Sequence, residues 1–279
     1  MSTALLQYPS PAPVRPAPPA TVDAVEALVA PLALRARNSD RLRYQPSPPF
    51  RRQGRDFTLP HFIFNGPPAG GDIIRLGLFA AIHGDEPEGA WALTALIETL
   101  LDRPELAAGY QLHFYPVCNP TGYTSGIRAS SSGTDLNRAF WRRSSEPEVW
   151  WLEHELITRR FHGLVSLHSD DTASGLYAYV RGAVFSETLA RPALAAATRF
   201  IPVDPRPVID GFAARSGLLD QCFDGVLAAP PAFLEPQPFE IIFETPQAVP
   251  PSLQVQAGHA ALLGILDAYR GFLSYQASI

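Results

Sequence analysis

The feature that most constrains this chain is the stretch 76–89, which reads L-G-L-F-A-A-I-H-G-D-E-P-E-G. An apolar run of strand length, 76–82, ends abruptly in a polar turn with His83 and Glu86, and a helical pattern follows Pro87. A buried strand that turns into a helix places such polar residues at the carboxyl edge of a sheet, where open α/β folds bind ligands. An imidazole nitrogen and a carboxylate oxygen at this spacing are candidate zinc ligands, although polar loop caps also contain the pattern.

The rest of the chain alternates apolar runs of strand length with helical patterns. Predicted strands cover 57–64, 73–82, 111–117, 164–167, 177–180 and 239–243, and predicted helices cover 87–101, 147–161, 186–198 and 253–273. This alternation is typical of the α/β class, so we expect a mixed, mostly parallel β-sheet with helices on both faces.

The first 56 residues differ from the rest in composition and are predicted to form an N-terminal extension. Residues 2–20 are rich in proline and alanine, which is typical of extended chain. A helix is predicted over 22–36 with Thr21 as its N-cap. The basic, proline-broken stretch 41–55 reads as a linker or long loop, with a basic patch for an acidic partner as the alternative.

Composition excludes several classes of function. All 22 cationic residues are arginine, so Schiff-base chemistry through a lysine is excluded, and the net charge of −5 opposes a nucleic-acid partner. The sequence has no apolar run long enough for a membrane span and no signal-peptide pattern. We therefore expect a cytoplasmic protein that does not bind membranes. Cys118 and Cys222 are expected to be buried thiols in a reducing compartment, with a disulfide between them as the alternative.

Two further polar residues follow apolar runs of strand length. His168 comes directly after 164–167 and Glu244 directly after 239–243, so both are expected at the same sheet edge as His83. Two histidines and one glutamate with an open fourth position make up a catalytic zinc site, and a second carboxylate beside it can serve as general base and acid. Taken singly, each of these residues has a simpler interpretation as a buried histidine or a loop-capping carboxylate.

A glycine- and serine-rich loop between these strands carries a dense polar cluster of Arg128, Asp135, Asn137 and Arg138. Arginine can grip a carboxylate through two parallel hydrogen bonds, and asparagine can add a donor. Asp135 can accept the free N–H of a zinc-bound histidine. The alternative is a solvated turn with a weak Arg–Asp surface pair.

These motifs occur in the order H-x-x-E, N-P-x-G, Arg, G-x-D-x-N-R, S-x-H and E-T-P. The order resembles the zinc carboxypeptidase superfamily, and the H-G-D-E form resembles its succinylglutamate desuccinylase/aspartoacylase branch and the compact murein peptide amidases. The resemblance implies a catalytic domain over residues 57–279, after the extension over residues 1–56. It also implies one Zn²⁺ per chain, bound by His83, Glu86 and His168.

The resemblance further implies a role for each remaining candidate. Asp135 would orient the first zinc-binding histidine, and Arg128 would stabilise the oxyanion next to the metal. Asn137 and Arg138 would hold the free carboxylate of the substrate. Glu244 would activate the attacking water and pass its proton to the leaving amine.

The chain departs from the family pattern in two respects. Pancreatic-type enzymes carry a tyrosine about 20 residues before the general base, whereas residues 220–224 contain none, which leaves Tyr177 and Tyr179 as candidates on geometry alone. The β-rich domain that follows the base in the aspartoacylase branch is also missing, because only 35 residues follow Glu244. Both differences favour a compact catalytic domain.

We therefore expect a zinc-dependent amide or peptide hydrolase, similar to metallocarboxypeptidases, that acts on a small substrate with a free carboxylate. An N-acyl amino acid deacylase of the succinylglutamate desuccinylase/aspartoacylase kind is the alternative. A non-catalytic binding module on the same scaffold is a second alternative, but the loss of a ligand or of the base that it predicts is not seen in the sequence. The expected partner is a small peptide or an N-acyl amino acid.

Overall fold

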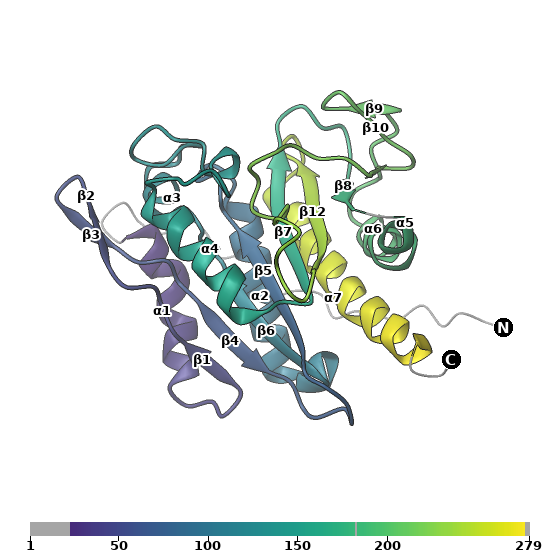
Figure 1. The fold of residues 1–279 in the computed structure, drawn as a ribbon, viewed down its shortest axis with the longest axis horizontal. Coiled ribbons are helices and arrows are strands. Elements are labelled where there is room, and N and C mark those ends of the chain that lie inside the picture. Colours follow the sequence, from purple (N-terminus) through teal and green to yellow (C-terminus); the bar gives the residue numbers. More distant parts are fainter. Residues whose placement is uncertain (1–22, 182, 277–279) are drawn as a thin grey trace.

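An eight-stranded sheet forms the centre of the computed structural model, which describes residues 23–181 and 183–276 (Figure 1). Its strands are β1 (Leu42–Tyr44), β4 (Phe62–Asn65), β5 (Ile74–Ala80), β6 (Tyr110–Tyr115), β7 (Gly163–Asp170), β8 (Tyr177–Val180), β11 (Leu218–Leu219) and β12 (Phe239–Pro246). They lie in the order β1-β4-β6-β5-β7-β12-β8-β11.

The central strands are parallel and the flanking ones mostly antiparallel. The pairs β6–β5, β5–β7, β7–β12 and β8–β11 are parallel, whereas β1–β4, β4–β6 and β12–β8 are antiparallel. The prediction of a mixed, mostly parallel α/β sheet is thus confirmed.

Helices cover both faces of this sheet. One face packs against α1 (Ala24–Ala36), α2 (Pro87–Asp102), α6 (Arg191–Ala197) and α7 (Pro251–Gln276), and the other packs against α4 (Pro147–Arg159). In Figure 1, α4 lies in front of the sheet and α2 lies behind it. Smaller elements are the hairpins β2 (Phe50–Arg52)–β3 (Arg55–Phe57) and β9 (Val208–Ile209)–β10 (Phe212–Ala213), the helices α3 (Pro120–Ser125) and α5 (Ala183–Phe185), and the short turns η1 (Pro104–Ala107), η2 (Leu136–Arg138) and η3 (Ser186–Ala190).

The two-residue period of a strand divides its side chains between the two faces. In β5, Leu76 and Leu78 belong to the core under α2 and α7, whereas Phe79 belongs to the core under α4. Burial of one such side chain contributes about 1.5–3 kcal/mol relative to exposure. This two-sided burial explains why the sequence of β5 is a continuous apolar run.

Several predicted element boundaries were wrong. The strand predicted over 57–64 is interrupted, because β3 ends at Phe57 and β4 begins at Phe62, with Pro60 between them. Proline lacks the amide hydrogen that a strand ladder needs. The stretch 41–55, predicted to be a linker or loop, instead contains β1, β2 and the start of β3.

The segment before β4 packs onto the same core as the rest of the described chain. Val29 and Leu32 of α1 and Leu42 of β1 are buried in the core beneath α2. Asp23 caps α1 by accepting a hydrogen bond from the amide of Val25 at 2.9 Å, so the helix begins two residues later than predicted. The predicted cap, Thr21, and the proline-rich stretch before it lie outside the described residues.

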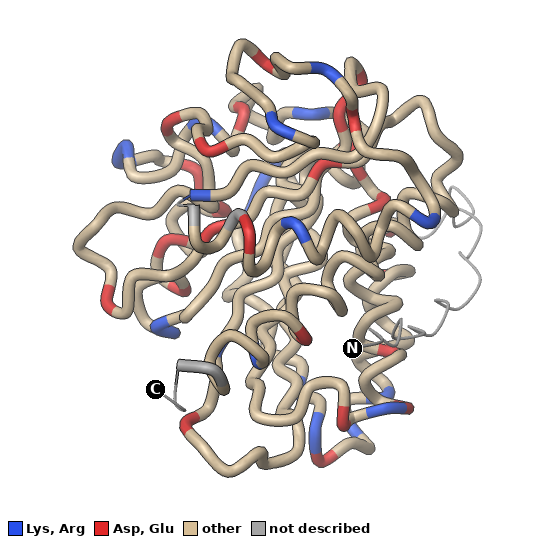
Figure 2. Tube along the Cα trace, turned by 90° about the vertical axis from the view of Figure 1, so that its right-hand side faces the viewer, with Lys and Arg blue, Asp and Glu red and all other residues tan. Residues whose placement is uncertain are grey.

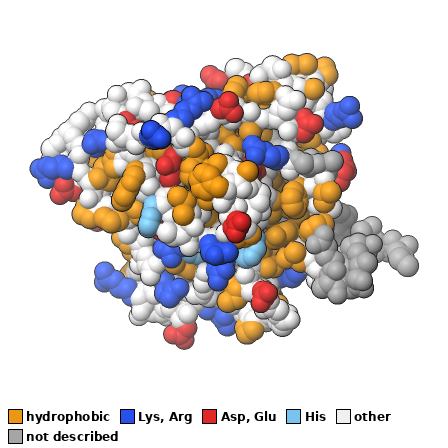
Figure 3. Space-filling view, viewed as in Figure 1, with side chains coloured by type: hydrophobic (Ala, Val, Ile, Leu, Met, Phe, Trp, Pro, Cys, Tyr) orange, Lys and Arg blue, Asp and Glu red, His pale blue; other side chains and the backbone are white. Residues whose placement is uncertain are grey.

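Charged and apolar side chains are mixed over the surface. Figure 2 shows acidic and basic residues interspersed along the trace, and Figure 3 shows exposed apolar side chains in separate patches among charged ones. Within residues 23–181 and 183–276, none of the helices has both the length and the hydropathy required to cross a bilayer.

Candidate active site

Three buried side chains with metal-binding atoms meet at the carboxyl edge of β5 and β7. His83 and Glu86 lie in the turn between β5 and α2, and His168 lies on β7. One ligand atom from each lies within 4.8 Å of the others, and all three residues are buried. The structure therefore brings together the three residues that were predicted to bind the metal.

The carboxylate of Glu86 lies between the two imidazoles. Its Oε1 is 2.5 Å from Nδ1 of His83, and its Oε2 is 3.0 Å from Nδ1 of His168. The backbone amide of Ser169 also donates to Oε2 at 3.1 Å. Two imidazole nitrogens and one carboxylate oxygen match the donor set of a catalytic zinc site, which keeps one position open.

The other nitrogen of each imidazole faces the protein. His83 Nε2 is 3.3 Å from Oδ1 of Asp135, and His168 Nε2 is 2.9 Å from Oγ of Ser166. Such partners fix the orientation of the ring and leave Nδ1 of each histidine directed at the shared centre. Asp135 is therefore positioned as the predicted role requires, while Ser166 is an additional partner.

The protonation states of two of these residues suit metal binding. Burial lowers the pKa of His168, which favours the neutral imidazole that binds metals. Burial alone would raise the pKa of Glu86, but the two neighbouring imidazoles outweigh it and hold that pKa below its usual range. The carboxylate is then ionised at neutral pH, as a ligand must be.

The turn that carries His83 is fixed by a close backbone approach. A Cβ atom on Gly84 would lie 2.0 Å from the carbonyl carbon of Gly122, so a side chain does not fit there. Asn119 supports the same contact, because its side chain caps α3 by accepting from the amide of Gly122 at 2.8 Å and donates to the carbonyl of Ile82 at 3.3 Å. This contact gives the N-P-x-G motif a structural role.

Glu244 lies on β12 beside this centre and lines the same cavity of about 200 Å³. Strand pairing places it next to His168 of β7 on one side and Tyr177 of β8 on the other. Burial, then the nearby charges of Glu86 and Asp170, raise the pKa of Glu244 well above its usual range. A carboxylate with a raised pKa can take up a proton and release it again, as a general base and acid must.

Two arginines line the cavity in different ways. Arg128 donates through Nε and Nη2 to Oδ2 of Asp135, at 3.2 and 3.1 Å, and its Nη1 is 3.5 Å from Oε1 of Glu86. The guanidinium of Arg138 lies 4.4 Å from the ring centroid of Phe223 and donates to the backbone carbonyl of Asn137. Arg138 forms no ion pair with the residues that the structure describes, so its charge is available to a ligand.

Asn137 is buried, and both ends of its amide face the protein. Its Oδ1 accepts from the amide of Leu227 at 2.9 Å, and its Nδ2 is 3.5 Å from Nε2 of His168. It therefore joins the loop before β12 to the metal centre. Its predicted contact with a substrate carboxylate remains a prediction.

Several further residues line the cavity. They are polar groups from β7, β8 and the loops around them, together with apolar wall residues: Asp85, Ser169, Asp170, Asp171, Tyr177, Tyr179, Asp210, Cys222, Phe223, Val226, Ile242 and Gln247. Tyr177 donates to Asp170 at 2.9 Å and Tyr179 donates to Asp210 at 2.6 Å. Asp170 could have been found from the sequence, because it lies two residues after His168 and side chains at that spacing share a face of a strand.

Comparison with known proteins shows which families and structures the chain resembles. Residues 72–202 match the family described as the succinylglutamate desuccinylase/aspartoacylase catalytic domain. This segment contains His83, Glu86 and His168, whereas Glu244 lies beyond it. A search of curated proteins found no match.

Solved structures share the fold. A candidate metallopeptidase from Shewanella amazonensis is 21% identical, with a TM-score of 0.72 over 89% of this chain and 93% of that chain. A metallo-carboxypeptidase from Burkholderia cenocepacia is 15% identical, with a TM-score of 0.63 over 89% of this chain and 69% of that one. A succinylglutamate desuccinylase/aspartoacylase from Rhodobacter sphaeroides is 19% identical, with a TM-score of 0.51 over 82% of this chain and 66% of that one.

The chain thus shares the fold of these metallopeptidase and carboxypeptidase structures, and its buried centre of two histidines and one glutamate is consistent with a metal site. Within residues 72–202, the chain is similar to the catalytic domain of the succinylglutamate desuccinylase/aspartoacylase family.

Proposed function

We propose that this protein is a zinc-dependent amide hydrolase that cleaves a small peptide-like substrate next to a free carboxylate. One observation carries the proposal. A single cavity is lined by the buried His83, Glu86 and His168, by the carboxylate of Glu244 and by the guanidinium of Arg138. A metal site, a proton-transfer group and an anchor for a carboxylate thus lie within reach of one small substrate.

His83, Glu86 and His168 are the residues that would hold the zinc ion. When bound, zinc polarises an amide carbonyl and lowers the pKa of water to about 7. The ligand set is supported by its composition and by the contact of each second imidazole nitrogen with Asp135 or Ser166.

Glu244 is the proposed general base. It takes a proton from the attacking water and gives it to the leaving amine, so one carboxylate serves both steps of the hydrolysis. Its burial and its place beside His168 on the neighbouring strand support this role.

Arg128 is the proposed donor to the oxygen of the cleaved carbonyl. The side chain is about half exposed, and Asp135 holds it through two contacts beside Glu86. A guanidinium fixed in this way can stabilise negative charge that develops in the transition state without first having to reorganise.

Arg138 is the proposed anchor for the substrate carboxylate. Phe223 supports the flat face of its guanidinium, and no carboxylate among the described residues neutralises it. Arginine can then bind a carboxylate through two parallel hydrogen bonds. In this role Arg138 fixes the distance between the free carboxylate of the substrate and the amide that is cleaved.

An N-acyl amino acid deacylase is a second candidate, because the family match over residues 72–202 favours it. The two candidates share the chemistry and the carboxylate anchor and differ in the group on the other side of the amide.

The test is hydrolysis of a mixed panel by zinc-loaded protein, with and without a chelator. The panel contains dipeptides, γ-glutamyl-diaminopimelate peptides and N-acyl amino acids. Chelator-sensitive release from peptides alone supports the peptide hydrolase, and release from N-acyl amino acids alone supports the deacylase. No turnover of any substrate by protein that holds about one zinc per chain would contradict the proposal and favour a non-catalytic binding module.

A further inference from the structure

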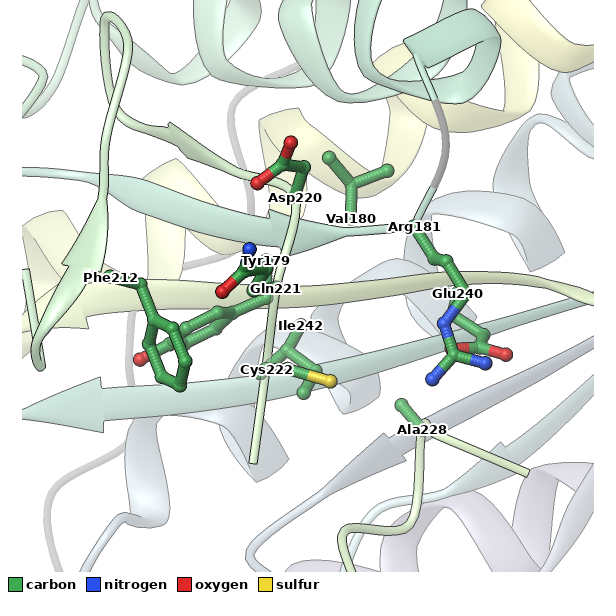
Figure 4. Close-up of a pocket in the computed structure, with 10 residues that line it drawn as sticks. All are labelled: Tyr179, Val180, Arg181, Phe212, Asp220, Gln221, Cys222, Ala228, Glu240 and Ile242. Atoms are coloured by element: carbon green, nitrogen blue, oxygen red, sulfur yellow. The ribbon is translucent and has the colours of Figure 1, made fainter. Parts of the chain in front are cut away.

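A second cavity, of about 270 Å³, lies next to the candidate active site (Figure 4). Residues from β8, β12 and the loop around Cys222 line it. Tyr179, Cys222 and Ile242 line both cavities, so the two are adjacent. In Figure 4, Phe212 and Tyr179 lie toward one end of the second cavity, and Arg181 and Glu240 lie at the other.

Glu240 is the unusual residue in this cavity. Only 4% of its surface is exposed, and its buried Oε2 has no hydrogen-bond partner among the described residues. The same Oε2 lies 3.4 Å from Nε of Arg181, an ion contact and not a hydrogen bond, and 57% of the Arg181 side chain is exposed. A buried carboxylate is costly unless hydrogen bonds and opposite charge compensate it, and here the compensation is incomplete. Burial accordingly raises the pKa of Glu240 to about 7.

The remaining lining is apolar and aromatic, which suits the aliphatic part of a ligand. Ala228 and Ile242 supply apolar surface between the two ends. Phe212 and Tyr179 place their ring centroids 6.2 Å apart in an edge-to-face arrangement at the end near the active site. Aromatic faces and carboxylates both attract organic cations.

The geometry of β12 connects the two cavities. Glu240, Ile242 and Glu244 alternate along the strand and therefore face the same side of the sheet. Glu240 and Glu244 are four residues apart, which corresponds to about 13 Å. An amino acid whose backbone lies at Glu244 could therefore direct a long side chain past Ile242 toward Glu240.

We propose that the second cavity binds an organic cation, a primary ammonium or guanidinium on an aliphatic stem, with Glu240 as its counter-ion. The cation completes the compensation that Arg181 provides only in part. Two sources have this chemistry: the side chain of the substrate itself, or a separate small molecule that binds beside the active site. Only the first source rests on the proposed hydrolase function.

The test begins with binding of n-butylammonium to the zinc-loaded full chain, measured by isothermal titration calorimetry against 1-butanol and butyrate. We expect n-butylammonium to bind at least about ten-fold more tightly than either comparison compound, because only it forms a charge-assisted hydrogen bond with Glu240. This comparison uses the unaltered protein, so it does not depend on the folding of a variant. Equal binding of the three compounds, or no binding of n-butylammonium, would overturn the proposal.

Variants then identify the residue. Glu240→Gln removes the charge with little change in shape and is expected to weaken n-butylammonium binding about ten-fold or more. Glu105→Gln makes the same chemical change at an exposed glutamate of η1 and should leave binding unchanged. Equal binding to the Glu240→Gln variant and the unaltered protein would show that the cation binds elsewhere.

Kinetics distinguish the two sources. If the cation belongs to the substrate, peptides that end in lysine are cleaved with a higher kcat/KM than peptides that end in norleucine, and Glu240→Gln lowers this ratio about ten-fold. If the cation is a separate ligand, the ratio is unchanged and n-butylammonium alters the rate without competing with the substrate. If no substrate is cleaved, the proposed hydrolase function fails, while the binding comparison still decides whether the second cavity takes a cation.

Discussion

Glu244 and His168 are direct partners in the register of the parallel pair β7–β12. Across the other edge of β12, Glu244 is paired with Tyr177 of β8. The hydrogen bonds of the central sheet thereby fix the candidate base beside a candidate metal ligand. The relative position of these two side chains depends on strand pairing and not on the conformation of a loop, which suits a site that needs a fixed geometry.

Glu244→Gln is expected to reduce kcat by at least about 100-fold, because the amide can neither accept the proton from water nor deliver it to the leaving amine. The same change should raise the thermal stability of the metal-free protein near pH 7, because burial penalises the charge of Glu244. Initial rates and thermal melts check the two effects, with Glu105→Gln as the exposed control. Retention of most activity would contradict the role as general base.

The metal site predicts about one zinc per chain after reconstitution, measured by elemental analysis. His168→Ala should lower this stoichiometry strongly, because it removes one of the three proposed ligands. His154→Ala removes an exposed histidine of α4 and should leave the stoichiometry unchanged. Equal zinc content in both variants would contradict the assigned ligand set.

Gly84→Ala is expected to disturb the metal site although it removes no ligand. The new methyl group would meet the backbone of Gly122, which cannot yield as a flexible side chain can. The turn must then shift, and His83 moves with it. Weaker zinc binding and a lower melting temperature should therefore occur together. Gly71→Ala is the matched control, since a Cβ there meets nothing within 4 Å. Unchanged zinc affinity in the Gly84 variant would show that the turn tolerates the displacement.

Arg138→Ala should raise KM for substrates with a free carboxylate about 10- to 100-fold, because a charge-assisted, bidentate contact is lost. Substrates with an amidated terminus should be affected little, so the preference for the free acid falls. Arg142→Ala, at an exposed arginine four residues away, provides the control. An equal rise in KM for acid and amide substrates would show that Arg138 does not bind the substrate carboxylate.

Three buried histidines predict loss of stability in acid. Burial lowers the pKa of His113 to about 3 and that of His259 to about 4, and burial with the neighbouring His113 lowers the pKa of His61 to about 2. Folding therefore favours the neutral rings, so their contribution is fully present above the unfolded-state pKa of about 6.5 and is lost as pH falls toward the folded values.

Each of these histidines should add about 1.4 kcal/mol per pH unit to the dependence of the unfolding free energy between about pH 6 and 4. Denaturant unfolding across this range measures the slope. His259→Gln should reduce this slope by about 1.4 kcal/mol per pH unit, because the unfolded chain then takes up one proton fewer. His154→Gln, at an exposed histidine, should leave the slope nearly unchanged. A slope of zero over this range would contradict neutral, buried rings.

The sequence predicted the turn with His83 and Glu86 because its elements are local: an apolar strand, a polar turn and a helix begun by Pro87. It also predicted that His168 belongs to the same site. The strand ends were wrong, because β7 continues through Asp170 and β12 through Pro246. Polar side chains on these last residues suggested that the strands had ended, whereas they line a cavity.

Residues that depend on long-range pairing could not be predicted. Nothing local to Glu240 indicates that its side chain meets Arg181, the residue after β8, because the antiparallel contact of β12 with β8 joins segments about 60 residues apart in sequence. The contact of Asn137 with Leu227 is of the same kind, at a separation of 90 residues. Proline-rich loops between β8 and β12 carry no periodicity from which such contacts could be inferred.

The shared face of Glu240, Ile242 and Glu244 has a consequence for how this site can change in evolution. A substitution can alter the charge or size of one of these three side chains, while β12 keeps its pairing with β7 and β8. An insertion or deletion of one residue before Glu240, at the start of β12, would turn all three side chains to the opposite side of the sheet at once. Near this site, length variation among relatives is therefore expected outside the strand, and new substrate preferences should arise by single replacements within it.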